Sequence, residues 1–376
     1  MEKNSKIYVA GHKGLVGSAI WKNLQGKGYN NLIGKSLDEL DLLDQNATEQ
    51  FFRQEKPEYV FLAAAKVGGI VANNTYRGEF IYENLTIQNN VIHNAWKHGV
   101  KKLLFLGSTC IYPKQAPQPM KENYLLTSPL EYTNEPYAIA KIAGIKLCES
   151  YNLQYGTNFI AVMPTNLYGP NDNFDLEKSH VLPALMRKIH LGKCLKENNW
   201  HDIRKDLNSR PIENIDGNNE KEEMVAVLKK YGVFPANDKD DVTIEIWGTG
   251  KPQREFLWSE EMADACVYLM ENINFQDIIS AMQENSKEEI KEIRNTHINI
   301  GTGEDISINN LAKLISEAVG FEGELDFNED KPDGTYRKLT DVTKLHELGW
   351  HHKTDIEEGV KKLYHWYLSQ QENQQA

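Results

Sequence analysis

Residues 6–17 read KIYVAGHKGLVG, a short apolar run followed by three glycines spaced Gly-x-x-Gly-x-x-Gly. The apolar run predicts a short buried strand over Lys6–Ala10. Between a strand and a helix, Gly11 permits a tight turn and Gly14 lets backbone N–H groups approach a pyrophosphate. Gly17 then allows the helix to pack closely on the sheet. The stretch predicts a dinucleotide-binding turn, although an ordinary loop can contain the same spacing.

The alternation of strand and helix continues downstream and indicates a parallel sheet covered on both faces. We expect an α/β fold with a doubly wound, Rossmann-type sheet. Ligands bind such sheets beyond the carboxyl ends of the strands. Further strands are expected at Asn31–Gly34, Tyr59–Ala64, Lys102–Gly107 and Phe159–Met163, and helices at Gly14–Gly28, Asn84–His98 and Glu135–Tyr155.

The alternation breaks after Pro164, which predicts a second part of the chain. We expect residues 1–170 to form the dinucleotide-binding domain, with return segments near 241–270 and 297–303. Residues 171–376 then form mainly a smaller C-terminal substrate-binding lobe. Polar insertions are expected at 195–241 and 273–296, with helices at 222–231 and 286–294. The other expected elements are a strand at Thr243–Trp247 and helices at Ser259–Asn272, Asn310–Val319 and Ile356–Ser369.

Composition limits the possible partners. The net charge of −12 argues against nucleic acid, whose phosphates require a basic surface. The four cysteines form no C-x-x-C pair, which favours a reducing compartment. The polar N-terminus does not resemble a signal peptide, and no apolar run approaches the length of a membrane span. We therefore expect a cytoplasmic protein without a membrane or metal partner.

Three side chains predict carbonyl chemistry. Tyr137 and Lys141 are four residues apart and share one helix face. A tyrosine hydroxyl can protonate a carbonyl oxygen, and a nearby ammonium lowers the tyrosine pKa. Ser108 follows the strand at 102–107 and can hydrogen-bond the same oxygen. This is the only Tyr-x-x-x-Lys in the chain, and its place downstream of the glycine turn makes it informative.

Longer motifs carry a family resemblance. They are LAAAKVGGI at 62–70, GSTCIYP at 107–113, NEPYAIAK at 134–141 and MPTNLYGP at 163–170, with later matches at 247–248, 254–257 and 331–335. On these residues the chain resembles the extended short-chain dehydrogenase/reductase family and, within it, the GDP-L-fucose synthase family of epimerase-reductases. The resemblance covers nearly all of the chain except the two insertions. It implies an NADP(H)-dependent conversion of GDP-4-keto-6-deoxy-D-mannose to GDP-L-fucose by a homodimer.

Cys110 and His180 distinguish an epimerase-reductase from a plain reductase. In an extended chain Cys110 would face the same side as Ser108. Epimerisation beside a ketone requires one group to remove a proton and another to return one, and thiolate and imidazole suit this near neutral pH. By themselves, a cysteine is often a small buried hydrophobe and a histidine often a helix cap. The resemblance implies the acid/base pair, for which we take Cys110 as base and His180 as acid.

The cofactor is expected to be NADP(H) rather than NAD(H). Lys13 and Lys35 lie in the glycine loop and after the second strand, where an NAD-preferring site places a carboxylate. The family often has arginine at the positions of Lys13 and Leu37, and both lysines could instead be ordinary surface residues. The resemblance implies the following cofactor contacts: Gly11, His12, Lys13, Gly14, Leu15, Val16, Gly17, Lys35, Asp41, Leu42, Ala63, Ala64, Ala65, Leu106, Gly107, Tyr137, Lys141, Pro164, Thr165, Asn166, Leu167 and His180.

Cations must also hold the diphosphate of a GDP-sugar. The resemblance implies substrate contacts at Asn166, Lys188, Trp247, Arg254, Lys331, Asp333 and Lys338. Arg187 and Arg337 could equally be surface ion pairs, and Trp247 a core residue. Two rival functions stay open: a nucleotide-sugar 4-epimerase or dehydratase that recycles bound NAD, and a non-catalytic dinucleotide sensor. Thr109-Cys110, where a dehydratase places acidic residues, and the intact Ser108, Tyr137 and Lys141 favour the epimerase-reductase.

Overall fold

The structure is a computed structural model that describes residues 1–235, 241–284, 289–331 and 333–372. The chain divides into two compact units. Unit 1 comprises Met1–Leu167, Glu255–Glu304 and Leu339–Lys353, and unit 2 comprises Tyr168–Arg254, Asp305–Lys338 and Thr354–Ala376. Among the described residues, no helix combines the length and apolar character needed to cross a membrane.

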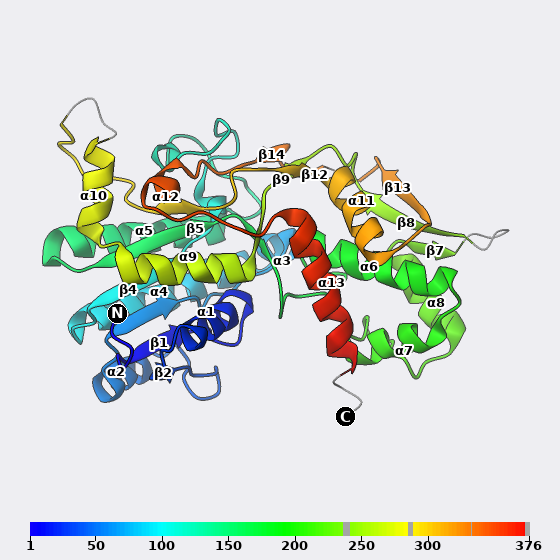
Figure 1. Cartoon of the computed structure of the whole chain (residues 1–376), viewed down its shortest axis with the longest axis horizontal. Helices are drawn as coiled ribbons and strands as arrows, with labels where there is room; N and C mark the ends of the chain where they lie inside the picture. Colours follow the sequence, from blue (N-terminus) through cyan, green and yellow to red (C-terminus); the bar gives the residue numbers. More distant parts are fainter. Residues whose placement is uncertain (236–240, 285–288, 332, 373–376) are drawn as a thin grey trace. The chain divides into compact units, whose positions relative to one another are not determined.

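Unit 1 is built on a six-stranded sheet in which every pair of neighbours is parallel (Figure 1). Its spatial order is β11-β5-β4-β3-β1-β2. The strands are β1 (Ile7–Ala10), β2 (Leu32–Ile33), β3 (Tyr59–Leu62), β4 (Lys102–Leu106), β5 (Phe159–Pro164) and β11 (Ile298–Ile300). Chain order reverses on the two sides of β1, so the turns after β1 and β3 lie at the switch point where doubly wound sheets bind ligands.

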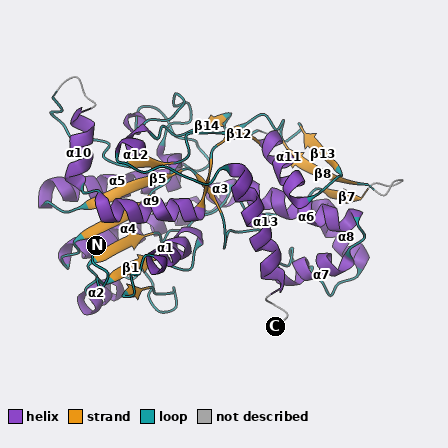
Figure 2. Ribbon diagram, in the orientation of Figure 1, coloured by secondary structure: helices purple, strands orange, loops and turns teal. Residues whose placement is uncertain are grey.

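Alternate residues of each strand enter two separate cores, as pleating requires. Ile7 and Val9 pack with α1 (Leu15–Gly26) and α9 (Ser259–Asn272). Tyr8 and Ala10 pack with the helices of the other face. Those helices are α2 (Gln45–Glu55), α4 (Arg77–Lys97) and α5 (Glu135–Tyr155). Figure 2 shows the strands of this unit between helices on both sides. The predicted doubly wound α/β fold is confirmed.

Unit 2 contains a three-stranded sheet in the order β13-β8-β7 and a second small sheet in the order β12-β9-β14. The strands are β7 (Val233–Pro235), β8 (Val242–Trp247), β9 (Gln253–Arg254), β12 (Ile306–Ser307), β13 (Glu324–Asn328) and β14 (Arg337–Lys338). The helices are α6 (Val181–Lys196), α7 (Trp200–Ser209), α8 (Lys221–Lys230), α11 (Ile308–Val319) and α13 (Ile356–Glu372). The first polar insertion thus contributes α7 and α8.

Several expected elements differ from the structure. The helix expected at 286–294 lies partly outside the described residues, and residues 289–294 form none. The helix of that insertion is α10 (Phe275–Glu284), whose Phe275 and Ile278 are buried. Tertiary packing therefore overrides the charge pattern. Elements that the sequence pattern missed or left incomplete are α2, α3 (Ile70–Thr75), α7, α12 (Thr343–Glu347) and the paired strands β6 (Asn166–Tyr168) and β10 (Phe256–Trp258).

Arg187 joins helix α7 of the first insertion to helix α6 within unit 2. Its side chain on α6 is 1% exposed and pairs with Asp206 on α7, which is 0% exposed. The guanidinium also donates to the carbonyls of Phe174 and Arg210. The hydroxyl of Tyr367 on α13 donates to the other Asp206 oxygen. Arg187 is therefore a buried structural cation rather than a substrate contact.

Replacing Arg187 by Met should strongly destabilise the protein, because it removes the buried guanidinium that pairs with the Asp206 carboxylate. The expected loss is about 3–5 kcal/mol in the free energy of unfolding, measured by urea denaturation. Lys230→Met is the matched control, since that lysine pairs with Glu213 at the surface of the same insertion. Equal loss in both variants would contradict the structural role of Arg187.

Candidate active site

The glycine turn after β1 has the shape that a pyrophosphate requires. Gly11 adopts φ +82°, and an added Cβ there would lie 2.8 Å from the Ala64 nitrogen. Gly14 caps α1 without any side-chain hydrogen bond, and its N–H donates to the Gly11 carbonyl at 3.0 Å. The first turn of α1 holds no acidic residue. A helix N-terminus of this kind attracts an anion, so these residues fit a dinucleotide.

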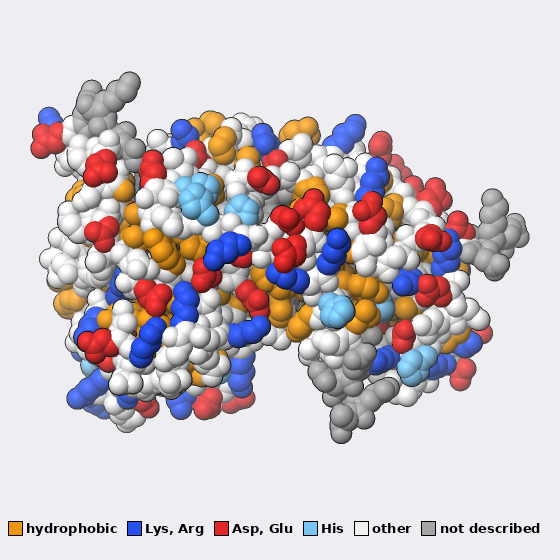
Figure 3. Space-filling view, viewed as in Figure 1, with side chains coloured by type: hydrophobic (Ala, Val, Ile, Leu, Met, Phe, Trp, Pro, Cys, Tyr) orange, Lys and Arg blue, Asp and Glu red, His pale blue; other side chains and the backbone are white. Residues whose placement is uncertain are grey.

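The end of β2 is less basic than the sequence suggests. Lys13 is exposed, but the Lys35 ammonium lies 3.6 Å from the Glu39 carboxylate. The backbone N–H and hydroxyl of Ser36 also donate to Glu39, each at 2.8 Å. The expectation of no carboxylate near this strand end is wrong, because the turn folds Glu39 back four residues. On the face drawn in Figure 3, acidic and basic side chains are interspersed.

Ser108 and Cys110 lie just beyond β4, but the chain there is not extended. Residues Thr109–Ile111 form a 3₁₀ turn that Ser108 caps, and its Oγ accepts the Cys110 N–H at 3.3 Å. The expected shared side of a strand is therefore wrong. Cys110 is 8% exposed and forms no disulfide. Cys110 nevertheless follows the same strand end at which the Lys141 ammonium bonds the Leu106 carbonyl, and a Cys110 thiolate would raise the pKa of both Tyr137 and Lys141.

Helix α5 presents Tyr137 and Lys141 as its spacing predicts. The Lys141 ammonium donates to the Leu106 carbonyl at 2.8 Å and lies 5.6 Å from the centre of the Tyr137 ring. Burial lowers the pKa of Lys141 to about 8, while Cys110 opposes this shift. Burial, assisted by Cys110, raises the pKa of Tyr137. The expected lowering by Lys141 is wrong for the protein alone, and the hydroxyl stays protonated and able to act as an acid.

The pKa of Lys141 predicts how activity depends on pH. Below about pH 8 its ammonium is charged and can stabilise phenolate that forms when Tyr137 gives up a proton. We expect kcat/KM for ketone reduction to fall as pH rises through about 8, since this ratio reports groups of the free enzyme. Lys141→Arg keeps its charge at higher pH and should lose that inflection. An unchanged inflection in this variant would assign it to another group.

The other predicted cofactor positions of unit 1 gather around the turn. Ala63 and Ala64 follow β3, and their backbone lies against Gly11. The ring of His12 packs against Gly34 and Trp21, and its Nδ1 is buried without a partner. The remaining positions are placed as follows: Leu15, Val16 and Gly17 on α1, Leu106 and Gly107 at the end of β4, Pro164 at the end of β5, Thr165 directly after it, Asn166 and Leu167 on β6, and Ala65 after Ala64.

Asp41 and Leu42 lie apart from this pattern. An Asp41 side-chain oxygen accepts the Leu43 N–H at 2.9 Å, as in a local turn. Leu42 is buried in the core beside α2 and α4, and its carbonyl accepts a hydrogen bond from Asn90 at 2.8 Å. These contacts stabilise the local fold. A cofactor role for Asp41 and Leu42 rests on the resemblance alone.

His180 and Lys188 belong to unit 2. His180 is the N-cap residue of α6, but its side chain makes no capping hydrogen bond. The residue is exposed to solvent. Loss of water around its ring lowers its pKa. Lys188 is one α6 residue past Arg187, and its ammonium lies 3.4 Å from the Glu245 carbonyl. Burial lowers the pKa of Lys188 to about 8. His180 lies in unit 2 and Cys110 in unit 1, and their pairing as acid and base stays a prediction.

Trp247 is 63% exposed at the end of β8, so it is not a core residue. The Lys331 ammonium lies 5.3 Å from the centre of its ring. Such an exposed aromatic face suits stacking against a flat ligand. Asp333 differs from expectation because its carboxylate accepts both the N–H and the hydroxyl of Thr249, at 2.9 and 2.7 Å. It thereby fixes the turn after Trp247, which is a supporting role.

Arg254 and Lys338 lie on adjacent paired strands. Lys338 of β14 is the parallel partner of Arg254 in β9. Burial lowers the pKa of Arg254, and the Asp333 carboxylate opposes the shift. Arg337 instead pairs with Asp305 through two hydrogen bonds, at 2.5 and 3.2 Å, as the ion-pair alternative requires. Two cations on one sheet suit a diphosphate.

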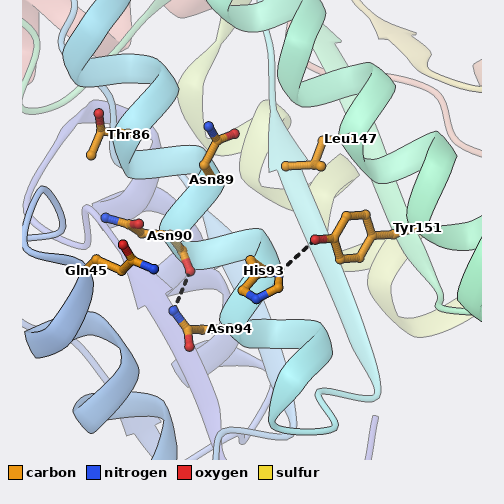
Figure 4. Close-up of a pocket in the computed structure, with 8 residues that line it drawn as sticks. All are labelled: Gln45, Thr86, Asn89, Asn90, His93, Asn94, Leu147 and Tyr151. Carbon is orange, nitrogen blue, oxygen red and sulfur yellow. Dashed lines mark hydrogen bonds between the residues drawn. The ribbon is translucent and has the colours of Figure 1, made fainter.

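A separate polar pocket lies on the outer side of unit 1, with a volume of about 450 Å³. Figure 4 shows side chains from α2, α4 and α5 around it, with His93 bonded to the Tyr151 hydroxyl at 2.8 Å. Its lining residues are Gln45, Thr86, Asn89, Asn90, His93, Asn94, Leu147 and Tyr151. None of them is among the predicted site residues, so this pocket is distinct from the candidate active site.

Comparisons with known proteins agree with this geometry. The model of the "NAD dependent epimerase/dehydratase family" matches residues 7–210 and 217–282. GDP-L-fucose synthase 1 of Arabidopsis thaliana is 50% identical over 367 residues, which cover 98% of this chain and 94% of that protein. The GDP-L-fucose synthase of Escherichia coli is 46% identical over 367 residues, 98% of each chain.

A solved structure is also similar. The GDP-mannoheptose C4 reductase of Campylobacter jejuni, with NADP bound, superimposes with a TM-score of 0.84 at 48% identity. The match covers 98% of this chain and 99% of that one. The glycine turn, the Tyr137 and Lys141 pair and these full-length similarities lead to one conclusion. The chain belongs to the NAD dependent epimerase/dehydratase family.

Proposed function

We propose that this protein converts GDP-4-keto-6-deoxy-D-mannose to GDP-L-fucose, with NADPH as reductant. The observation that carries the proposal is the position of Cys110 in the turn that Ser108 caps, just past β4, where the Lys141 ammonium bonds the Leu106 carbonyl. A plain carbonyl reductase has no use for a thiol at this place, whereas an epimerase needs a proton-transferring group there. The two GDP-L-fucose synthases reported above support the same substrate.

The first stage inverts C3 and C5, the carbons on either side of the C4 ketone. Cys110, as thiolate, takes the proton from carbon, and the electron pair moves into an enolate whose oxygen faces Ser108 and Tyr137. His180, as imidazolium, returns a proton from the opposite face. Each step leaves the carbon skeleton unchanged and only exchanges protons. A lowered pKa of His180 makes its protonated form a stronger acid.

The second stage reduces the C4 ketone. When bound, NADPH supplies the hydride. Tyr137 gives its hydroxyl proton to the carbonyl oxygen, so that the ketone becomes an alcohol. Lys141, held by the Leu106 carbonyl, lies near enough to stabilise the phenolate that remains. Ser108 holds the same oxygen by a hydrogen bond. Both stages act on one carbonyl, so a single set of residues serves both.

The nucleotide part of the substrate requires cations and a flat surface. We propose that Lys188, Arg254, Lys331 and Lys338 neutralise the diphosphate and that Trp247 stacks on the base. Asn166 is proposed to contact the sugar, and Asp333 to support this group by fixing the turn after Trp247. Arg254 can bind phosphate oxygens in a bidentate way, whereas the lysines act as point charges.

The preference for NADPH is proposed to rest on Lys13 and Lys35. Lys35→Ala should raise the KM for NADPH about tenfold, since a charged hydrogen bond contributes about 1.5–3 kcal/mol. The KM for NADH should change little, because NADH lacks the 2′-phosphate. Lys97→Ala removes another surface lysine of unit 1, paired with Glu49, and serves as control. If Lys35→Ala affected both cofactors alike, another group would hold the 2′-phosphate.

A second candidate function is the reduction of a GDP-4-keto-heptose without epimerisation. The similarity to the GDP-mannoheptose C4 reductase supports it, since that enzyme is nearly as similar in sequence as the fucose synthases. The two functions share the Tyr137 chemistry and differ in the use of Cys110. A heptose has one carbon more than a hexose and needs more room beside C6. Comparing the two sugars as substrates tests whether the site has that room.

One assay decides between these functions. The purified enzyme is supplied with GDP-4-keto-6-deoxy-D-mannose and NADPH in D₂O. NADPH oxidation, the product and deuterium at C3 and C5 are then followed. GDP-L-fucose with deuterium at both carbons is expected. Reduction without deuterium would favour the heptose reductase, which a GDP-4-keto-heptose would confirm. If neither sugar caused NADPH oxidation, both candidate functions would be rejected. The protein would then be a dinucleotide-binding protein without this reductase activity.

We also propose that the enzyme acts in the cytoplasm as a homodimer. Large apolar side chains are exposed on α4 and α5, namely Tyr82, Ile139, Leu153 and Tyr155. Such groups on two neighbouring helices suit a contact between two copies. Light scattering coupled to size-exclusion chromatography should give twice the chain mass of 43.0 kDa. A mass equal to one chain would reject the dimer.

A further inference from the structure

Glu255 is a buried carboxylate to which the chemistry above assigns no role. It is 0% exposed and stands directly after Arg254. One carboxylate oxygen accepts the N–H groups of Thr302 and Gly303, at 2.7 and 2.8 Å. The other accepts the N–H and hydroxyl of Thr340, at 2.9 and 2.6 Å. Three N–H groups and one hydroxyl thus surround the two oxygens, and these hydrogen bonds stabilise the ionised carboxylate against the burial that raises its pKa.

The backbone of Glu255 extends this set. Its carbonyl accepts the Asn166 side-chain amide at 2.8 Å and the Thr165 hydroxyl at 3.3 Å. Gly301 leaves room for the carboxylate, because an added Cβ would overlap both Glu255 and Thr340. All of these residues belong to unit 1. We call Glu255, Thr165, Asn166, Thr302, Gly303 and Thr340 the Glu255 node.

The position of the node in the chain is unusual. The chain passes between the units after residues 167, 254, 304, 338 and 353. The node holds a residue within two positions of each of the first four crossings. The hydrogen bonds of the node therefore hold, within unit 1, the chain next to four of the places where it passes from one unit to the other. Three proposed substrate contacts stand at these places: Asn166, Arg254 and Lys338.

We propose that Glu255 is a positioning residue for the nucleotide sugar, because its carboxylate fixes the segments that carry Asn166, Arg254 and Lys338. This inference rests on the proposed function for the identity of the substrate. Small errors in the placement of binding groups are costly, since displacement by about 1 Å can lower a rate about 100-fold. The cofactor contacts expected at the glycine turn and after β3 lie outside the node, and only Thr165 and Asn166 are shared with it. The GDP-sugar should therefore respond more strongly than NADPH to the loss of the node.

Glu255→Gln is the sharpest test because it keeps size and shape. The glutamine amide replaces one acceptor oxygen by an NH₂ group, which is a donor. That NH₂ group would lie against either the Thr340 N–H or the Thr302 and Gly303 N–H groups, and those hydrogen bonds would be lost. We expect the KM for the GDP-sugar and the Kd for GDP to rise about 10- to 100-fold, and the KM for NADPH to stay within about twofold. Hydrogen exchange should become faster at the amides of residues 302, 303 and 340.

Two further variants separate positioning from stability. Gly301→Ala keeps the Glu255 side chain but displaces its carboxylate, because the added methyl group would overlap it. This variant should raise the same KM. Glu149→Gln alters another buried carboxylate of unit 1, which accepts the Thr296 N–H at 3.3 Å. It should lower the melting temperature without changing either KM. Thermal unfolding of all three variants shows how much stability each one loses.

The outcomes are distinct. A selective rise in the GDP-sugar KM and the GDP Kd, together with faster exchange at the node, supports the proposal. A parallel rise in the KM for both reactants, or loss of stability with both KM values unchanged, overturns it. Failure of the wild type to reduce the ketone rejects the proposed function instead. GDP titration and hydrogen exchange then still report on the node, since neither needs turnover.

Discussion

Tyr137→Phe should nearly abolish ketone reduction while leaving the fold intact. The variant removes only the hydroxyl that protonates the C4 oxygen, and general acid catalysis of this kind contributes about 10²–10⁴-fold to a rate. We expect kcat for NADPH oxidation to fall by about that factor. Burial keeps the Tyr137 hydroxyl protonated, and the Lys141 ammonium lies 5.6 Å from the centre of its ring. Ser108 is proposed to hydrogen-bond the same oxygen but not to give up its proton.

Exchange of the C3 and C5 protons should suffer less in this variant. Cys110 and His180 move those protons, and Tyr137 contributes only a hydrogen bond to the enolate oxygen. Deuterium incorporation, followed by NMR without NADPH, measures this step separately. Tyr155→Phe makes the same chemical change at the exposed end of the same helix and should retain full activity. Equal loss of reduction and exchange in Tyr137→Phe would mean that one group serves both steps.

Cys110→Ser should give the opposite result. A serine hydroxyl is too weak an acid to form the anion that takes a proton from carbon near neutral pH. We expect deuterium exchange at C3 and C5 to fall about 10²–10⁴-fold. NADPH should still be oxidised slowly, because Tyr137 and Lys141 are unchanged. The product should then keep the substrate's configuration at C3 and C5.

The thiol itself must be separated from general damage to the core. Cys148→Ser is the matched control, since Cys148 is buried on α5 among apolar residues of unit 1. It should lower stability without slowing exchange at C3 or C5. Normal formation of GDP-L-fucose by Cys110→Ser would remove Cys110 from the mechanism. The second candidate function would then gain, because reduction alone needs no thiol.

Tyr137→Phe depends on features that the sequence predicts well. The strand–glycine–helix unit at 6–17 and the Tyr137 and Lys141 pair both lie within short stretches. Backbone geometry over a few residues decides them, because residues four apart share a helix face and glycine tolerates φ of +82°. The period-two alternation along β1 likewise assigns its side chains to two cores. Such local rules suffice for the fold class.

The sequence pattern missed some short turns and the effects of burial. Glu39 accepts hydrogen bonds from Ser36 in the turn after β2, and Cys110 lies in a 3₁₀ turn rather than an extended strand. The direction of the Tyr137 pKa shift follows from burial, which depends on the whole unit. Arg187 is read from sequence as a possible substrate contact, yet burial against Asp206 makes it structural.

Spacing over a few residues is enough to predict the doubly wound sheet, the dinucleotide turn and the reactive side chains. Which charges are buried, and which backbone groups donate to them, depends on the folded chain. Glu255 is the clearest case, since its donors lie 47 to 85 residues along the chain. A buried carboxylate needs such donors wherever the chain provides them, and no local pattern in the sequence records that need.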